Sequence, residues 1–93
     1  MKVYLVEYSR YNSWGEIKDR HIQEVFRDRQ FANSYMIGKA LKYAGSDYHV
    51  SLTNSGVNVD TMRAEKSNTK AMEEEIVEIR VIEKDLKFLI ARE

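Results

Sequence analysis

One segment of the chain has helical spacing, and the stretches on both sides of it alternate like strands. Between Asp28 and Gly45, apolar residues recur at three to four positions. They are Phe31, Tyr35, Gly38 and Leu41, flanked by Ile37 and Ala44. Asp28 suits an N-cap, and Gly45 suits the left-handed position after a last helical turn. We therefore predict a helix over residues 29–44, with Gly38 packed closely on a sheet.

Alternating patterns before and after this helix predict strands. Residues 2–8 alternate with two largely apolar faces, which is typical of a central strand. Residues 16–26 alternate imperfectly, so we expect a β-bulge and a short antiparallel hairpin with the first strand. Residues 48–53 and 57–59 flank the turn signal Asn54-Ser55-Gly56 and predict a second hairpin.

The last third of the chain fits two structures. Apolar residues recur at helical spacing over residues 72–90, which would suit a helix. The β-branched run that begins at Ile76 favours a strand instead. We predict a strand at 75–83 and a short helix or turn at 85–91. Residues 63–70 have no apolar period, and we predict a mobile loop there.

These elements predict a single α+β domain over residues 1–93, in the order ββαβββ. A chain of 93 residues is a usual length for one domain. We expect a mostly antiparallel sheet with the 29–44 helix on one face. The predicted core is Val3, Leu5, Val25, Phe26, Phe31, Leu41, Val50, Leu52, Ile79 and Val81.

Composition excludes several functional classes. Lys plus Arg and Asp plus Glu number 15 each, so the chain lacks the overall positive field of non-specific nucleic-acid binders. It has no cysteine, which is typical of a reducing compartment, and we expect a cytoplasmic protein. No apolar stretch reaches the ~20 residues of a membrane span. We expect no membrane association.

No arrangement of residues with recognisable catalytic spacing occurs in the sequence. His21 and His49 are the only histidines, too few for a zinc site without carboxylates from elsewhere. The four glycines form neither a Walker loop nor a dinucleotide fingerprint. We therefore expect no enzyme activity, no metal site and no cofactor.

The stretch Ser9–Gly15 has the composition of a binding site. It holds Arg10, Tyr11 and the single tryptophan, Trp14, and two further cations follow at Lys18 and Arg20. Trp, Tyr and Arg dominate binding hot spots in protein interfaces. With single-stranded nucleic acid, the rings would stack on bases while the cations hold phosphates. A third interpretation is structural, with Tyr8 and Trp14 capping the end of a small core.

The run Glu73, Glu74 and Glu75 is the main acidic cluster. Such a run is most often a solvated face or a guard on an edge strand. The alternative is an acidic interaction face that mimics nucleic acid toward a basic partner.

Two stretches, residues 2–8 and 24–35, resemble a loose group of small accessory proteins of bacteria and their phages. The similarity lies in the MKVYLVEY-type first strand and in the strand-to-helix junction from Glu24 to Tyr35. It implies a ββα start, with Phe26 and Tyr35 packing the helix on the sheet.

Together these observations predict a non-enzymatic interaction protein of phage or mobile-element type. It would bind a protein partner as an inhibitor or adaptor, for example of a host defence or nuclease system. The alternatives are a small module for single-stranded nucleic acid or a nucleotide, and a homodimer formed through an exposed edge strand.

Overall fold

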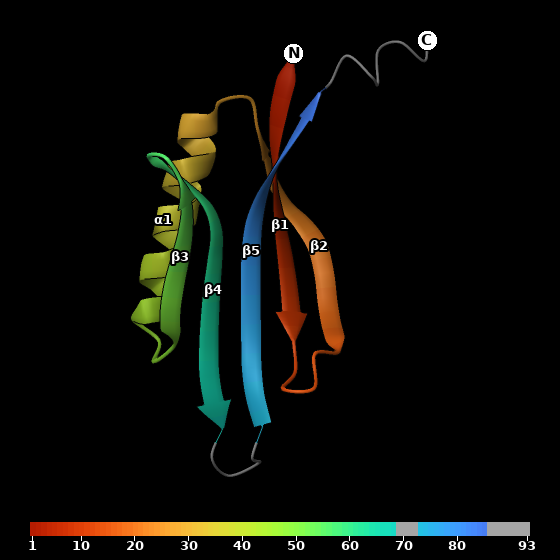
Figure 1. The fold of residues 1–93 in the computed structure, drawn as a ribbon, viewed down its shortest axis with the longest axis vertical. Helices are drawn as coiled ribbons and strands as arrows, with labels where there is room; N and C mark the ends of the chain where they lie inside the picture. Colours follow the sequence, from red (N-terminus) through yellow and green to blue (C-terminus); the bar gives the residue numbers. More distant parts are fainter. Residues whose placement is uncertain (69–72, 86–93) are drawn as a thin grey trace.

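The computed structural model describes residues 1–68 and 73–85 and has five strands and one helix in this part of the chain (Figure 1). The elements are β1 (Lys2–Tyr11), β2 (Ile17–Phe26), α1 (Arg29–Ala44), β3 (His49–Ser55), β4 (Asn58–Asn68) and β5 (Glu73–Asp85). The predicted order ββαβββ is confirmed.

All five strands form one antiparallel sheet in the order β2-β1-β5-β4-β3. The central pair joins the first strand to the last, with a register that runs from Lys2 opposite Asp85 to Tyr11 opposite Ile76. α1 packs on one face of this sheet, mainly over β4 and near β3, as Figure 1 shows. The opposite face, which we call the open face, is not covered by a helix of the described residues.

The core lies between α1 and the sheet. Because side chains alternate along a strand, β1 presents Val6 to the helix and β5 presents Ile79. Both side chains are fully buried, together with Met62 of β4 and Met36 of α1. The other buried apolar residues are Ala32, Ala40, Val59, Ala64 and Val77.

The predicted core is wrong at six positions, of which four are exposed. Phe31 and Leu41 of α1 are 61% and 70% exposed, because the helix turns its Ala32–Met36–Ala40 stripe to the sheet instead. Val25 is 55% exposed on edge strand β2, and Leu52 is 46% exposed on edge strand β3. Of the remaining predictions Ile79 is buried, and Phe26, Val50 and Val81 are half-buried against this core. Val3 and Leu5 are half-buried on the open face, outside the core, because they alternate with Val6 along β1.

The helix has the predicted bounds, but its ends differ from those expected. Asp28 is the N-cap residue with extended backbone, although its side chain makes no capping hydrogen bond. Gly45 has a right-handed φ of −72°, and the left-handed residue is Asp47 with φ of 66°. The expected close packing of Gly38 is also wrong, since a Cβ there would meet no atom within 4 Å.

The strands extend further than the sequence indicated. β4 runs to Asn68, so the predicted loop at 63–70 is wrong for its first six residues, and its last two lie outside the described residues. Residues 63–65 are held by backbone ladders to both β3 and β5, and residues 66–68 by the ladder to β5. The strand interpretation of the last third is confirmed by β5, while the helix or turn expected at 85–91 lies outside the described residues beyond Asp85. The expected bulges occur in β2 at Gln23 and Lys18, where the register with β1 shifts.

The two apolar stripes of α1 should differ sharply in their contribution to stability. We expect Met36→Ala to lower the free energy of unfolding by about 2–5 kcal/mol, because it leaves a cavity beneath the helix. Leu41→Ala, on the exposed stripe, should change it by less than about 1 kcal/mol. Urea unfolding measures both, and an equal loss in the two variants would contradict this packing.

Candidate binding surface

The hairpin that joins β1 to β2 is a short and well-ordered turn. β1 continues to Tyr11, so only residues 12–16 form the loop. The Asn12 side-chain oxygen accepts hydrogen bonds from the backbone N–H of Trp14 at 3.0 Å and of Glu16 at 2.9 Å. The Gly15 N–H donates to the Asn12 carbonyl at 3.1 Å, and Gly15 has a left-handed φ of 79° that favours glycine. Asn12 therefore fixes the backbone on which Trp14 is presented.

Trp14 lies at the tip of this hairpin and is 82% exposed. The structural interpretation, in which Tyr8 and Trp14 both cap the core, is therefore wrong for Trp14. Tyr8 does pack against the core on the helix side of the sheet. An exposed indole on a fixed turn offers a large apolar surface to a partner.

Tyr11 and Arg20 lie side by side on the open face. The Arg20 guanidinium donates to the Tyr11 hydroxyl at 3.1 Å and to the Ser9 hydroxyl at 3.1 Å. It also lies 4.0 Å from the Glu7 carboxylate, which accepts a 2.9 Å bond from Arg80. Arg20 is thus held in one orientation, and its charge is partly neutralised by Glu7 of the same sheet.

The other two predicted cations lie elsewhere. Arg10 follows the opposite parity of β1 and pairs in register with Asp19, so it lies on the helix side of the sheet. Lys18 is the extra residue of a bulge in β2 and forms an exposed ion pair with Glu16 at 3.4 Å. The structure therefore brings Tyr11 and Arg20 together, with Trp14 beyond them at the tip, and separates Arg10 and Lys18 from this surface.

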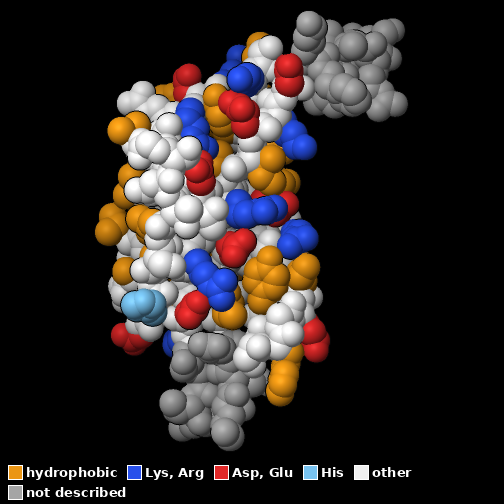
Figure 2. All heavy atoms as spheres, in the orientation of Figure 1, with side chains coloured by type: hydrophobic (Ala, Val, Ile, Leu, Met, Phe, Trp, Pro, Cys, Tyr) orange, Lys and Arg blue, Asp and Glu red, His pale blue; other side chains and the backbone are white. Residues whose placement is uncertain are grey.

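The registers arrange the open face in four rows that cross the strands. Two rows are apolar over β2, β1 and β5, namely Val25–Leu5–Ile82 and Ile17–Tyr11–Ile76, and the second continues as Glu65 and His49 on β4 and β3. Two polar rows lie between them, Ile22–Glu7–Arg80–Thr61–Thr53 and Arg20–Ser9–Glu78–Arg63–Ser51. In Figure 2, which keeps the orientation of Figure 1, basic and acidic side chains are interleaved down the face toward the viewer. This face therefore carries balanced charge between two apolar rows.

A cluster of tyrosines on the helix side was not foreseen from the sequence. Tyr43 and Tyr48 meet edge to face at 5.0 Å, and the Tyr48 hydroxyl donates to Glu75 at 2.9 Å. Burial, followed by the hydrogen bond to the Glu75 carboxylate, raises the pKa of Tyr48 to about 12. Burial also raises the pKa of Tyr8 and of Tyr43.

One of the three glutamates of the predicted acidic face belongs to this tyrosine cluster. Glu75 is half-buried and bonded to Tyr48, so it serves the fold. For Glu73 and Glu74, only the backbone pairing with Asn68 and Ser67 is described, and their side chains lie outside the described part.

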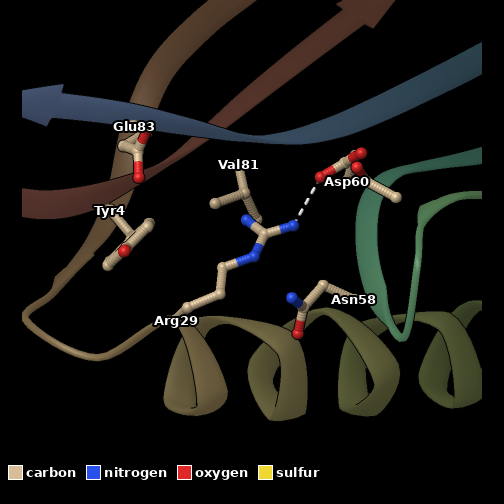
Figure 3. Close-up of a pocket in the computed structure, with 7 residues that line it drawn as sticks. Tyr4, Arg29, Asn58, Asp60, Val81 and Glu83 are labelled. Atoms are coloured by element: carbon tan, nitrogen blue, oxygen red, sulfur yellow. Dashed lines mark hydrogen bonds and ion pairs between the residues drawn. The ribbon is translucent and has the colours of Figure 1, made fainter.

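A hollow of about 300 Å³ lies on the helix side, at the start of α1. Figure 3 shows Arg29 reaching across it to an ion pair with Asp60, near Tyr4 and Asn58. The Arg29 guanidinium also donates to the Val59 carbonyl at 3.1 Å and lies 6.0 Å from the centre of the Tyr4 ring. The guanidinium at the centre of the hollow, that of Arg29, is already bonded to Val59 and Asp60. We therefore assign Arg29 the role of attaching α1 to β4.

The comparisons with known proteins do not extend this description. No protein-family model matches the chain, and no curated protein or solved structure is significantly similar to it. Within residues 1–68 and 73–85, no group of three or more acidic or histidine side chains is arranged to hold a metal ion. No helix of these residues has the length and apolar character needed to span a membrane.

Asn12 should stabilise the hairpin through its side-chain oxygen. We expect Asn12→Ala to lower the free energy of unfolding by about 1 kcal/mol, because two backbone N–H groups lose their acceptor. Ser13→Ala, at the exposed neighbouring position, should change it by less than about 0.5 kcal/mol. Urea unfolding of both variants measures the difference, and equal values would show that Asn12 does not order the turn.

The raised pKa of Tyr48 predicts a loss of stability in alkali. The phenol ionises near its ordinary pKa of 10.0 in the unfolded chain but near 12 in the folded protein. The unfolded state therefore loses its proton first, and stability should fall as the pH rises from about 10 to about 12. Tyr48→Phe should flatten this fall when the melting temperature is followed against pH. A fall of unchanged steepness would place its origin in other groups.

Proposed function

We propose that this protein is a non-enzymatic interaction module that binds another protein through the Trp14 hairpin. The observation that carries the proposal is the 82% exposed indole on a turn fixed by Asn12. A turn whose backbone is already ordered loses little conformational entropy on binding, so the apolar surface that it presents contributes more to affinity. In this proposal the protein acts by occupying a surface of its partner, as an inhibitor or adaptor.

Tyr11 and Arg20 would extend this contact from the tip onto the open face. Their mutual hydrogen bond of 3.1 Å holds both groups in place before a partner arrives. Tyr and Arg beside an exposed Trp form the composition that is enriched at binding hot spots. Arg10 and Lys18 are not part of the proposed contact, because they lie on the helix side and at the sheet edge.

Single-stranded nucleic acid is the less favoured partner. The cation nearest to Tyr11 is Arg20, which shares Glu7 with Arg80. A carboxylate within a phosphate-binding surface would repel the backbone that the arginines attract. Binding to nucleic acid would weaken steeply as salt rises, whereas a contact centred on Trp14 would respond weakly.

Trp14→Ala tests the proposal with a matched control on the same protein. Val57→Ala removes an equally exposed apolar group, 91% exposed, at the β3–β4 turn. Neither variant should change the unfolding free energy by more than about 0.5 kcal/mol. We expect wild type and Val57→Ala to retain a protein from a bacterial lysate that Trp14→Ala does not retain, with or without nuclease.

The purified partner can then be titrated by fluorescence, since Trp14 is the only tryptophan of this chain. Burial of the indole should shift its emission to shorter wavelength when the partner carries no tryptophan at the contact. Equal capture by Trp14→Ala would contradict the proposed site. Capture that nuclease abolishes would favour the nucleic-acid alternative.

A further inference from the structure

The two apolar rows of the open face lie outside the core beneath α1. Val25 is 55% exposed and Ile17 is 50% exposed, and within the described residues no helix lies over them. The outer face of a one-sided antiparallel sheet is normally polar. Apolar rows beside ordered charges are instead typical of an interaction surface.

We propose that a second copy of this chain covers the open face, forming a two-fold symmetric sandwich of two sheets. The axis would lie in the plane between the sheets, perpendicular to the strands and between the two polar rows. Each residue of one copy then faces a residue on the same strand of the other copy. The two residues lie in rows at equal distances on opposite sides of the axis. Aligned sheets of this kind pack about 10 Å apart at roughly 30°.

The apolar rows match each other under this symmetry. Leu5 would face Tyr11 of the second copy, and Ile82 would face Ile76 along β5. On β2, Val25 would face Ile17. Two apolar bands would therefore flank the polar centre of the interface, one on each side of the axis. Each band is made from one apolar row of each copy.

The charges match as well. Arg80 would face Glu78 of the second copy, and the symmetry repeats this contact once. A two-fold axis running along the strands fits less well: placed between β1 and β5 it would set Arg20 against Arg63, and placed on β5 it would set Glu78 against Glu78. The perpendicular axis sets Arg20 against Ile22 on edge strand β2, but it opposes no like charges among these rows. It is therefore the most self-complementary of the three placements.

The area of the open face is sufficient for a stable pair. Five strands about 4.8 Å apart, with about 3.3 Å per residue over ten residues, give a face of roughly 800 Å². A standard interface buries about 800 Å² on each partner. The small single core of this domain would gain a second apolar layer from the pairing.

Two charge-reversal variants, measured alone and as a mixture, test the proposed axis. Arg80→Glu alone would set two pairs of acids against each other, and Glu78→Arg alone would set two pairs of bases. We expect each variant to raise the dimer dissociation constant at least ~10-fold. An equimolar mixture should restore the dimer, because in the mixed dimer the two reversed residues face each other with opposite charges, and the unchanged Glu78 and Arg80 form the second pair. Effects within one subunit, such as the lost Arg80–Glu7 pair, would not be rescued by mixing.

Sedimentation equilibrium from about 1 to about 100 µM gives the dissociation constants, with the 11.0 kDa chain as the monomer reference. Val25→Glu should also dissociate the dimer, while Leu41→Glu on the exposed helix stripe should not. Wild type that stays monomeric over this range would overturn the proposal, and would leave the open face to a different protein or to residues 86–93. Loss of dimer in Leu41→Glu alone, or no rescue in the mixture, would also overturn it.

Discussion

The pairing of β1 with β5 is the interaction on which the rest of the structure depends. It joins the first strand to the last in an unbroken register from Lys2 to Tyr11, and it provides the outer edges on which β2 and β4 assemble. The same register sets the sidedness of the sheet. It places Val6 and Ile79 beneath α1, and Glu7 and Arg80 together on the open face. Because these strands are the most distant in sequence, the sheet is completed only when the whole chain has folded back on itself.

Local signals in the sequence predicted the elements better than they predicted the core. The bounds of α1 followed from its spacing between Asp28 and Gly45, and the order of helix and strands along the chain followed from where the alternating patterns lie. The spacing of Phe31 and Leu41 could not reveal that α1 has two apolar stripes, of which the sheet covers the one with Met36. The loop expected after Met62 is strand because its neighbours on both sides supply hydrogen bonds, which no local pattern records.

The candidate site was predicted in composition but not in shape. Neighbouring side chains of a loop need not point to opposite sides, as they do in a strand. We predicted Ser9–Gly15 as a loop and therefore expected Arg10 and Tyr11 to act on one surface. Once β1 continues through both, strand alternation puts them on opposite faces. The contact between Glu7 and Arg80 spans 73 positions of the chain and depends on the β1–β5 register, so it could not be read from either segment alone. Exposure of Trp14 also needed the structure, because a short hairpin can fold its tip back onto the sheet.

The two proposed surfaces would act together in a specific way. Under the proposed axis, the strands of the two copies run in opposite directions, so the two β1–β2 hairpin tips lie at opposite ends of the sandwich. A dimer would then present two Trp14 sites that one rigid monovalent partner cannot occupy at once, although two partners or a repeating partner could. Binding to a repeating partner would gain affinity from the linkage of the two sites without any new contact. Dimerisation would cover Tyr11 and Arg20 on the open face and so restrict the partner contact to Trp14 at the tip, while Asn12 continues to order each turn within its own chain.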